Sequence, residues 1–382
     1  MFSHTNRKGQ IIYGNDIFVR VSDFTFEELK GKPHSIIRHP DMPKAVFKTM
    51  WDTILENRSI VAYVKNKSKT GKFYWVLALV VPFQEGFLSI RIKPSSNIFK
   101  KIPELYEELL EIEKSDSMEA SVEVLRAAIT DLGFDNYEEF MVAAFAKEMK
   151  SWNQNLSSST ETTFLEISDL LEQSYLDSME LVKASERLQK EFGALKVLCM
   201  NMLIHSQRLG DVGSAMAVTF KTFGEWGDDI KKILESFHES QLLFMQACNQ
   251  SRLALGTAFM QDEMVTFFKK SDSASQEYIQ NLSELSSENK KFAENKISEL
   301  SKTFEKLVQA IKKLNESLMV FKFIKLNSKI EASHLPGGMV QMETTLEGTT
   351  SFITALETNG QKIKSQSDDI KKIIEKIKTI SF

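Results

Sequence analysis

The strongest constraint on the fold is a heptad pattern that occupies the chain from about residue 141 to its C-terminus. The clearest seam of apolar residues advances in alternating steps of three and four, through Ile297, Leu300, Phe304, Leu307, Ile311, Leu314, Leu318 and Phe321. A second seam lies between Phe164 and Leu195, and a third comprises Ile370, Ile373, Ile377 and Ile380. Apolar residues repeated about every 3.5 positions keep one stripe of a helix facing a partner helix. The pattern therefore predicts long antiparallel coiled-coil arms and an all-α four-helix bundle.

The same helical pattern occurs twice along the chain. Asn201 and Asn327 lie 126 positions apart (327 − 201), which is 18 heptads, and Ile204 and Ile330 have the same offset. An offset of a whole number of heptads gives the two residues of each pair the same heptad position, and so the same face of their helices. We interpret the helical region as an internal duplication.

Helix-breaking residues divide each copy into two arms. Gly210 and Gly213 interrupt the first copy, and Pro336–Gly338 interrupts the second. Each copy is therefore predicted to be a helical hairpin, the first over residues 141–270 and the second over 271–382. Two arrangements remain open: a monomeric pseudo-dimer in which both hairpins form one bundle, and a homodimer in which hairpins of two chains pair.

Residues 1–100 have a different character, because five of the seven prolines and most of the β-rich segments lie there. Helices are predicted at 26–29 and 45–56, and strands at 10–13, 59–65, 72–82 and 87–92. This order predicts a small α+β domain with an antiparallel sheet. Residues 101–140 are predicted to be a helical connector.

Composition excludes several classes of function. The net charge of −4 shows no overall excess of basic residues, so the composition does not indicate binding to nucleic acid. The longest strongly apolar run, Phe73–Phe83, is about half of a membrane-spanning helix, and residues 1–10 have no signal-peptide core. Cys199 and Cys248 form no metal-binding pair, and no P-loop, nucleophile elbow or kinase motif is present. We therefore expect a cytoplasmic, non-enzymatic protein with no catalytic residues, no metal and no membrane insertion.

Two strings near the N-terminus are specific enough to indicate a family: GQIIYGNDIFVRVSDFTFEELKGKPHSIIRHPDMPKAVFKTMWDTI and VKNKSKTGKFYWV. Over residues 8–95 the chain resembles the PAS domain of bacterial aerotaxis receptors, and Pro33–Pro43 is its most specific part. The resemblance implies a PAS fold for residues 1–100 that encloses FAD. It further implies that Arg38, His39 and Asp41 lie at the flavin pocket or its mouth.

The same resemblance makes Asn66 and Trp75 wall residues of the pocket or transmitters on the sheet. An arginine such as Arg38 can bind a phosphate bidentately, and an asparagine offers a donor and an acceptor to a ring edge. Haem is an alternative cofactor, with His34 or His39 as the iron ligand. The family carries a tryptophan where this chain has Ile60. FAD, haem or another small ligand, and no cofactor at all therefore remain open.

The segment Val197–Val218, VLCMNMLIHSQRLGDVGSAMAV, resembles the hairpin tip of methyl-accepting chemotaxis proteins. The residues that match the family pattern, and that we expect to bind partners, include Asn201, Ile204, Arg208, Gly210 and Gly213 in the first copy and Asn327, Ile330, Glu331 and Gly337 in the second. In that family the tip binds the chemotaxis histidine kinase and its coupling protein. Both copies depart from the family pattern, at His205–Gln207 and at Pro336.

Two functions follow from these observations. The first is a chemoreceptor-like signal transduction protein, whose PAS domain senses redox state, oxygen, energy or a ligand and relays it through the bundle to chemosensory partners. The alternative is a non-enzymatic scaffold, whose cofactor-free PAS domain docks a protein in a receptor array or a motor-associated assembly.

Overall fold

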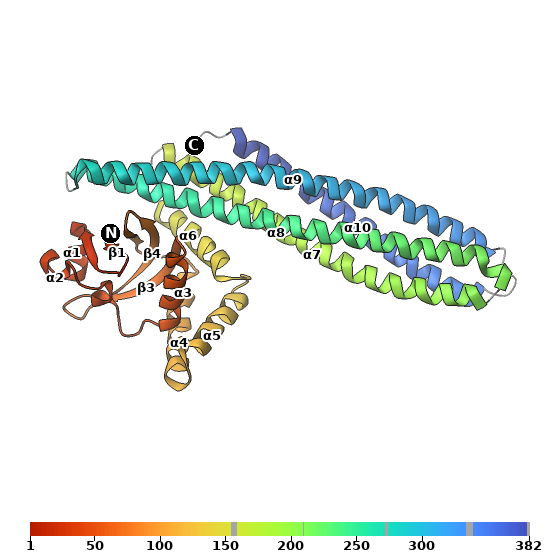
Figure 1. The fold of residues 1–382 in the computed structure, drawn as a ribbon, viewed down its shortest axis with the longest axis horizontal. Helices are drawn as coiled ribbons and strands as arrows, with labels where there is room; N and C mark the ends of the chain where they lie inside the picture. The colour runs from red at the N-terminus through yellow and green to blue at the C-terminus, as the bar shows by residue number, and fades with distance from the viewer. Residues whose placement is uncertain (154–158, 209, 272–273, 334–338, 380–382) are drawn as a thin grey trace. The chain divides into compact units, whose positions relative to one another are not determined.

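A computed structural model describes residues 1–153, 159–208, 210–271, 274–333 and 339–379 of the chain (Figure 1). The chain divides into two compact units. The first comprises Met1–Ser168 with Arg252–Ala293, and the second comprises Asp169–Ser251 with Glu294–Ser381. The predicted fold class is confirmed: an antiparallel sheet with helices in the N-terminal region is followed by long helices.

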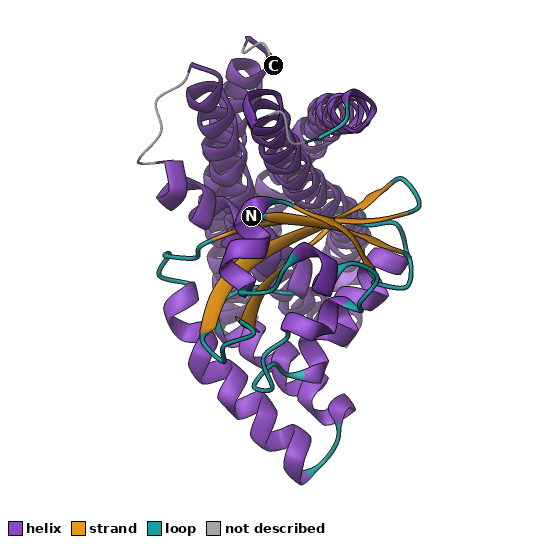
Figure 2. Ribbon diagram, turned by 90° about the vertical axis from the view of Figure 1, so that its left-hand side faces the viewer, coloured by secondary structure: helices purple, strands orange, loops and turns teal. Residues whose placement is uncertain are grey.

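The N-terminal sheet has the strand order β2-β1-β5-β4-β3, and every neighbouring pair is antiparallel (Figure 2). Its strands are β1 Phe2–Asn6, β2 Ile11–Gly14, β3 Ile60–Lys67, β4 Phe73–Phe83 and β5 Gly86–Ile92. Strand β1 was not predicted. Its sequence FSHTN lacks an apolar alternation, yet the strand lies between β2 and β5 and is almost wholly buried. Its formation depends on long-range pairing with β5.

Short helices precede β3 and lie over one face of the sheet. They are α1 Asp16–Ser22, α2 Phe26–Leu29, the 3₁₀ turn η1 His34–Ile37 and α3 Lys44–Leu55. The side chain of Asn15 caps α1, and Thr25 and Glu28 form a capping box at α2. Helix α3 packs on β3 and β4, so this face of the sheet is covered.

A helical connector follows the sheet: η2 Phe99–Lys101, α4 Ile102–Ser115, α5 Met118–Asp131 and α6 Tyr137–Asn153. It covers the free edge of β3. The hydroxyl of Tyr106 donates to the Tyr63 carbonyl oxygen at 2.7 Å, and that of Tyr137 donates to the Val61 carbonyl oxygen at 3.2 Å. Such a cover protects an edge strand from pairing with another chain.

Four long helices account for most of the remaining chain: α7 Ser159–Arg208, α8 Ser214–Ser271, α9 Gln276–Ser333 and α10 Met339–Thr379. A 3₁₀ turn, η3 Gly210–Gly213, joins α7 to α8 where the sequence predicts a break. Within the second unit, contacts join the helices in a closed order. Those contacts are Lys196–Asp228, Phe244–Phe304, Lys322–Glu357 and Lys362–Glu180. They link α7 to α8, α8 to α9, α9 to α10 and α10 to α7, so the parts of these helices in the second unit pack as a bundle.

The predicted seams are the buried faces of these helices. The seam on α9 from Ile297 to Leu314 is buried at every predicted position. On α10, however, Ile374 is buried and Ile373 is only partly so. Ile370 and Ile377 are both buried, so the seven-residue period holds, and the buried position between them is reached by a step of four instead of three. Among the described residues, no helix is long and apolar enough to span a membrane, and no cluster of three metal-ligating side chains is present.

Candidate functional site

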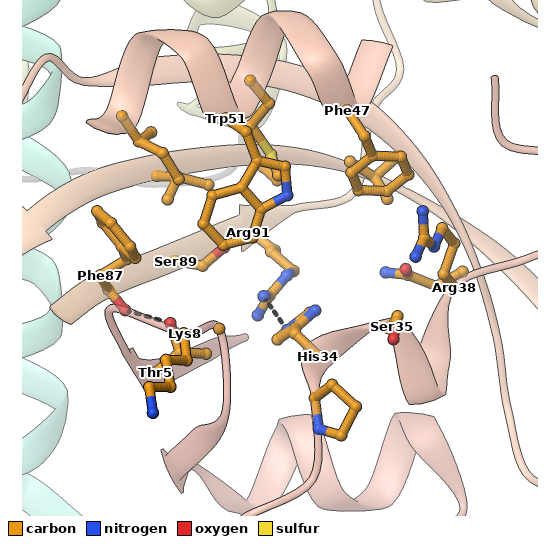
Figure 3. A pocket seen from close by; sticks show the side chains of 18 residues that line it. Thr5, Lys8, His34, Ser35, Arg38, Phe47, Trp51, Phe87, Ser89 and Arg91 are labelled. Atoms are coloured by element: carbon orange, nitrogen blue, oxygen red, sulfur yellow. Dashed lines mark hydrogen bonds between the residues drawn. The ribbon is translucent and has the colours of Figure 1, made fainter. Parts of the chain in front are cut away.

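A cavity of about 210 Å³ lies between the helix-covered face of the sheet, η1 and α3 (Figure 3). Alternate residues of the three neighbouring strands line it: Val64 and Asn66 on β3, Ala78 and Val80 on β4, and Phe87, Ser89 and Arg91 on β5. Successive side chains of a strand point to opposite faces, so the i, i+2 spacing brings these side chains to one face. The cavity is the candidate site.

Helix α3 supplies the apolar wall. Phe47, Met50, Trp51 and Ile54 line the cavity, and their spacing places them on one face of the helix. The Trp51 ring contacts Phe87 edge to face, with centroids 5.9 Å apart. Gly9 lies beneath the indole with φ +74°, and a Cβ there would come within 3.1 Å of the Trp51 ring. Glycine at this turn therefore leaves room for the Trp51 side chain.

Arg91 dominates the polar side of the cavity. Its Nη2 donates to Ser3 Oγ at 3.0 Å and to His34 Nε2 at 2.6 Å, and its guanidinium lies 5.5 Å from the centre of the Phe18 ring. Because arginine only donates, His34 must accept through Nε2. Burial and the charges of Arg91 and Arg38 hold the pKa of His34 well below its usual value. His34 is therefore a neutral acceptor at pH 7.

Among the described residues that line the cavity, three buried polar atoms have no hydrogen-bond partner: Asn66 Nδ2, Ser89 Oγ and Arg91 Nη1. Their side chains are at least nine-tenths buried. Unpaired buried polar groups are costly and uncommon, and those in native proteins call for an explanation. All three atoms can donate a hydrogen bond and all belong to residues that line one cavity, so the cavity is equipped to bind a ligand rich in acceptor atoms.

Three of the residues named from the sequence line the cavity: His34, Arg38 and Asn66. The Arg38 guanidinium lies 4.5 Å from the centre of the Phe47 ring, and the backbones of Arg38 and Asn66 form a β-bridge. This bridge holds the Pro33–Pro43 block against β3, beside the unpaired amide.

His39 and Asp41 lie outside the cavity. The backbone N–H of His39 donates to the Lys65 carbonyl oxygen at 3.2 Å, and Asp41 accepts from Lys65 Nζ at 2.7 Å. Lys65 holds the pKa of the Asp41 carboxyl below its usual value. In this structure the two residues fasten the block to the edge of β3. Neither contributes to the lining.

Trp75 also lies away from the cavity. It is paired with Lys65 across the strands and packs on Phe99 and Tyr106, with ring centroids 5.6 Å apart in each case. The residues of β4 that line the cavity include Ala78 and Val80, which are three and five positions after Trp75. Alternation along the strand therefore directs the indole to the opposite face.

The sequence predicted neither Arg91 nor Ser89 as a site residue, and Phe47 and Trp51 were not among the predicted site residues either. A signal for Arg91 was present, since it is the one charged residue within the apolar strand FLSIRI. Charged residues are rarely buried in such a strand without a specific partner. The residues that share its face could not be identified without the register of β1 against β5.

The tip residues are described only in part. Asn201, Ile204 and Arg208 are exposed at the end of α7, Ile330 is exposed on α9, Gly210 has φ +64°, and Gly213 is buried. The side chains of Asn327 and Glu331 and the whole of Gly337 lie outside the described residues. The predicted role of these residues in partner binding remains a prediction.

Comparison with known proteins identifies the N-terminal region. Residues 11–87 match the family model of the PAS fold. This region is a PAS domain. Over 114 residues the chain is 40% identical to the aerotaxis receptor of Escherichia coli (strain K12), covering 28% of this chain and 22% of the receptor. It is 23% identical over 128 residues to Phototropin-2 of Oryza sativa subsp. japonica, covering 32% of this chain and 14% of that protein.

These similarities concern a part of each protein. The chain spans less than a quarter of the length of either curated relative. Among solved structures, the light state of the blue-light photoreceptor Aureochrome1 LOV is 14% identical with a TM-score of 0.25, covering 26% of this chain and 85% of that one. The family match ends at residue 87, before the helical region begins.

The residues of the PAS cavity fit the ring system of a flavin. Its ring edge carries carbonyl oxygens and nitrogens that accept hydrogen bonds, and the cavity offers three unpaired donors beside an aromatic wall. The volume of about 210 Å³ is below the roughly 300–1,000 Å³ usual for drug-sized ligands, which favours one ring system over a whole dinucleotide. Haem fits less well, because His34 Nε2 accepts from Arg91 and His39 is outside the lining.

Proposed function

We propose that this chain is a signal transduction protein, in which the PAS domain binds a flavin and the helices relay its state to chemosensory protein partners. The observation that carries the proposal is the convergence of three buried, unpaired donors on one cavity, on Asn66, Ser89 and Arg91. The 40% identity to a protein named as an aerotaxis receptor supports the choice of a flavin.

The cavity residues would have distinct tasks. Asn66 and Ser89 would donate to acceptor atoms on the ring edge and so fix the orientation of the ring. Phe47 and Trp51 would pack against the ring and exclude water. Arg38, half-buried beside η1, would bind a phosphate of the cofactor. A bound flavin supplies a group whose charge changes with its redox state.

Strand β3 contacts both the cavity and the helical connector, so it could transmit a change in the charge of the flavin to the connector. Its side chain Asn66 faces the cavity, while its edge carbonyls at Val61 and Tyr63 accept from connector tyrosines. A ligand that alters the hydrogen bonding of Asn66 would therefore act on the strand that anchors α4 and α6. Signalling switches commonly act through such a local change in hydrogen bonding or charge on an element with two packing states.

Cofactor-free docking is the second candidate function. Ile60 is paired with Val80, which lines the cavity, and is itself fully buried, whereas the aerotaxis family has a tryptophan at this position. Together with the modest cavity volume, this substitution favours a PAS domain that contacts a protein instead of enclosing a cofactor.

Absorption spectroscopy on the purified full-length chain separates the two candidates. We expect a flavin band near about 450 nm, either as purified or after incubation with FAD, FMN or riboflavin. Binding would also quench the fluorescence of Trp51. The variant Asn66→Leu should weaken binding, whereas Asn201→Leu, on the exposed surface of α7, serves as the control. Failure of all three flavins to bind the wild-type chain would reject the flavin sensor and favour the docking module.

A further inference from the structure

Arg91 is a buried charge without a counter-ion in the part of the chain that the structure describes. Its side chain is 5% exposed, in a strand with neighbours on both sides. Among the described residues, no ion pair includes Arg91, and its polar contacts are neutral: Ser3 and His34. A buried charge is tolerated when it is paired and is strongly destabilising when it is not.

The surroundings of Arg91 reinforce this imbalance. The cavity lining contains three cationic side chains, Lys8, Arg38 and Arg91, beside the neutral His34, and it contains no Asp or Glu. Burial lowers the pKa of the Arg91 guanidinium to about 10, so it still carries its charge at pH 7. The cavity is therefore electropositive, and Nη1 of Arg91 remains without a partner.

We propose that Arg91 is the charge-recognition residue of the PAS cavity, and that it binds the negatively charged, acceptor-rich edge of the ligand. In this arrangement Asn66 and Ser89 complete the contact with neutral hydrogen bonds. The ligand supplies the negative charge that the protein omits. The inference rests on the proposed function only where a flavin is used as the probe.

One consequence concerns the chain without ligand. Arg91→Met removes the charge and keeps an unbranched side chain. Ser3 Oγ already lies 3.3 Å from His34 Nε2, so these two groups can pair with each other once the guanidinium is gone. We expect the unliganded variant to melt about 2–4 °C above the unliganded wild type. A residue that only holds the fold together would lower the melting temperature when removed.

The second consequence concerns the charge of the ligand. Two-electron-reduced flavin carries a negative charge on its pyrimidine ring near neutral pH, whereas oxidised flavin is neutral. Riboflavin is the appropriate probe because it has no phosphate to bind Arg38 or Lys8. We expect Arg91→Met to weaken binding of reduced riboflavin about tenfold more than binding of oxidised riboflavin. Arg91→Lys retains the charge and should retain the preference for the reduced form.

The experiment measures both effects on the full-length chain. Melting is followed by tryptophan fluorescence after exhaustive dialysis, and binding is measured anaerobically by quenching, with oxidised and dithionite-reduced riboflavin. A higher melting temperature together with a lost preference supports the proposal. A lower melting temperature for unliganded Arg91→Met, or equal weakening for the two forms, overturns it. Where the wild type binds neither form, the flavin proposal fails and the melting temperature alone decides the role of Arg91.

Discussion

Replacing Glu148 provides the most direct test of how the connector is attached to the PAS domain. This α6 carboxylate is 1% exposed and accepts four hydrogen bonds. Its Oε1 accepts from Tyr63 Oη at 2.9 Å and from Ser96 Oγ at 2.7 Å, and its Oε2 accepts from the backbone N–H groups of Ser95 at 2.6 Å and Ser96 at 3.0 Å. It therefore joins β3 and the segment after β5 to α6.

The structure sets different costs for two substitutions. Glu148→Ala leaves four buried or half-buried donors without an acceptor, two of which are backbone N–H groups that cannot turn away. We expect a loss of about 3–5 kcal/mol in the free energy of unfolding, because each buried donor left without an acceptor costs about 1–3 kcal/mol. Glu148→Gln keeps one oxygen for the two N–H groups, and its NH₂ can donate to the two hydroxyls. We expect it to cost about 1–2 kcal/mol.

Urea denaturation of the full-length chain, followed by tryptophan fluorescence, measures these losses, since Trp75 and Trp152 lie in the same unit as Glu148. Glu108→Ala, on the exposed face of α4, is the matched control and should change stability by less than about 0.5 kcal/mol. A cost below about 1 kcal/mol for Glu148→Ala, or equal costs for Ala and Gln, would refute this account of the attachment.

Two further predictions concern the strand pairing and the dependence on pH. Gly86→Ala would place a Cβ 1.8 Å from the Thr5 carbonyl oxygen, so we expect it to disrupt the β1–β5 pairing and to lower the free energy of unfolding by about 3 kcal/mol or more, measured by thermal unfolding. Gly193→Ala is the control, because its Cβ would enter open space, and it should be neutral or stabilising. Equal effects at the two sites would contradict the strand register. His34 has a folded-state pKa below its unfolded value of about 6.5, so the unfolded chain binds more protons and stability falls as pH drops through 6.5. His34→Gln should therefore show a shallower loss of stability than the wild type in denaturation between about pH 7.5 and pH 5, and an unchanged slope would assign the acid sensitivity to other groups.

Local sequence patterns were sufficient for most secondary structure. The heptad seams located the buried faces of the long helices, and Gly210 and Gly213 marked the turn between α7 and α8. Strands β3, β4 and β5 were predicted from runs of β-branched and aromatic residues. These signals are local because each depends on the spacing of apolar residues along one element and on turn residues beside it.

The candidate site was predictable only in part. The block Pro33–Pro43 directed attention to His34 and Arg38, which line the cavity, but equally to His39 and Asp41, which do not. Trp75 was included because of its residue type and its motif. Its position on the opposite face depends on strand register, where a shift of one residue exchanges the two faces of the sheet.

By itself, the sequence determined the α+β domain with its PAS fold and the helical region, and it predicted a duplication at an offset of 126 residues. Only the tertiary structure established β1, whose polar sequence is a strand because it pairs with β5 across more than eighty residues of chain. The same pairing brings Ser3 to Arg91 and sets Arg91 beside His34, Asn66 and Ser89. The chemistry of the cavity arises from contacts between residues far apart in the chain, and no local pattern encodes such contacts.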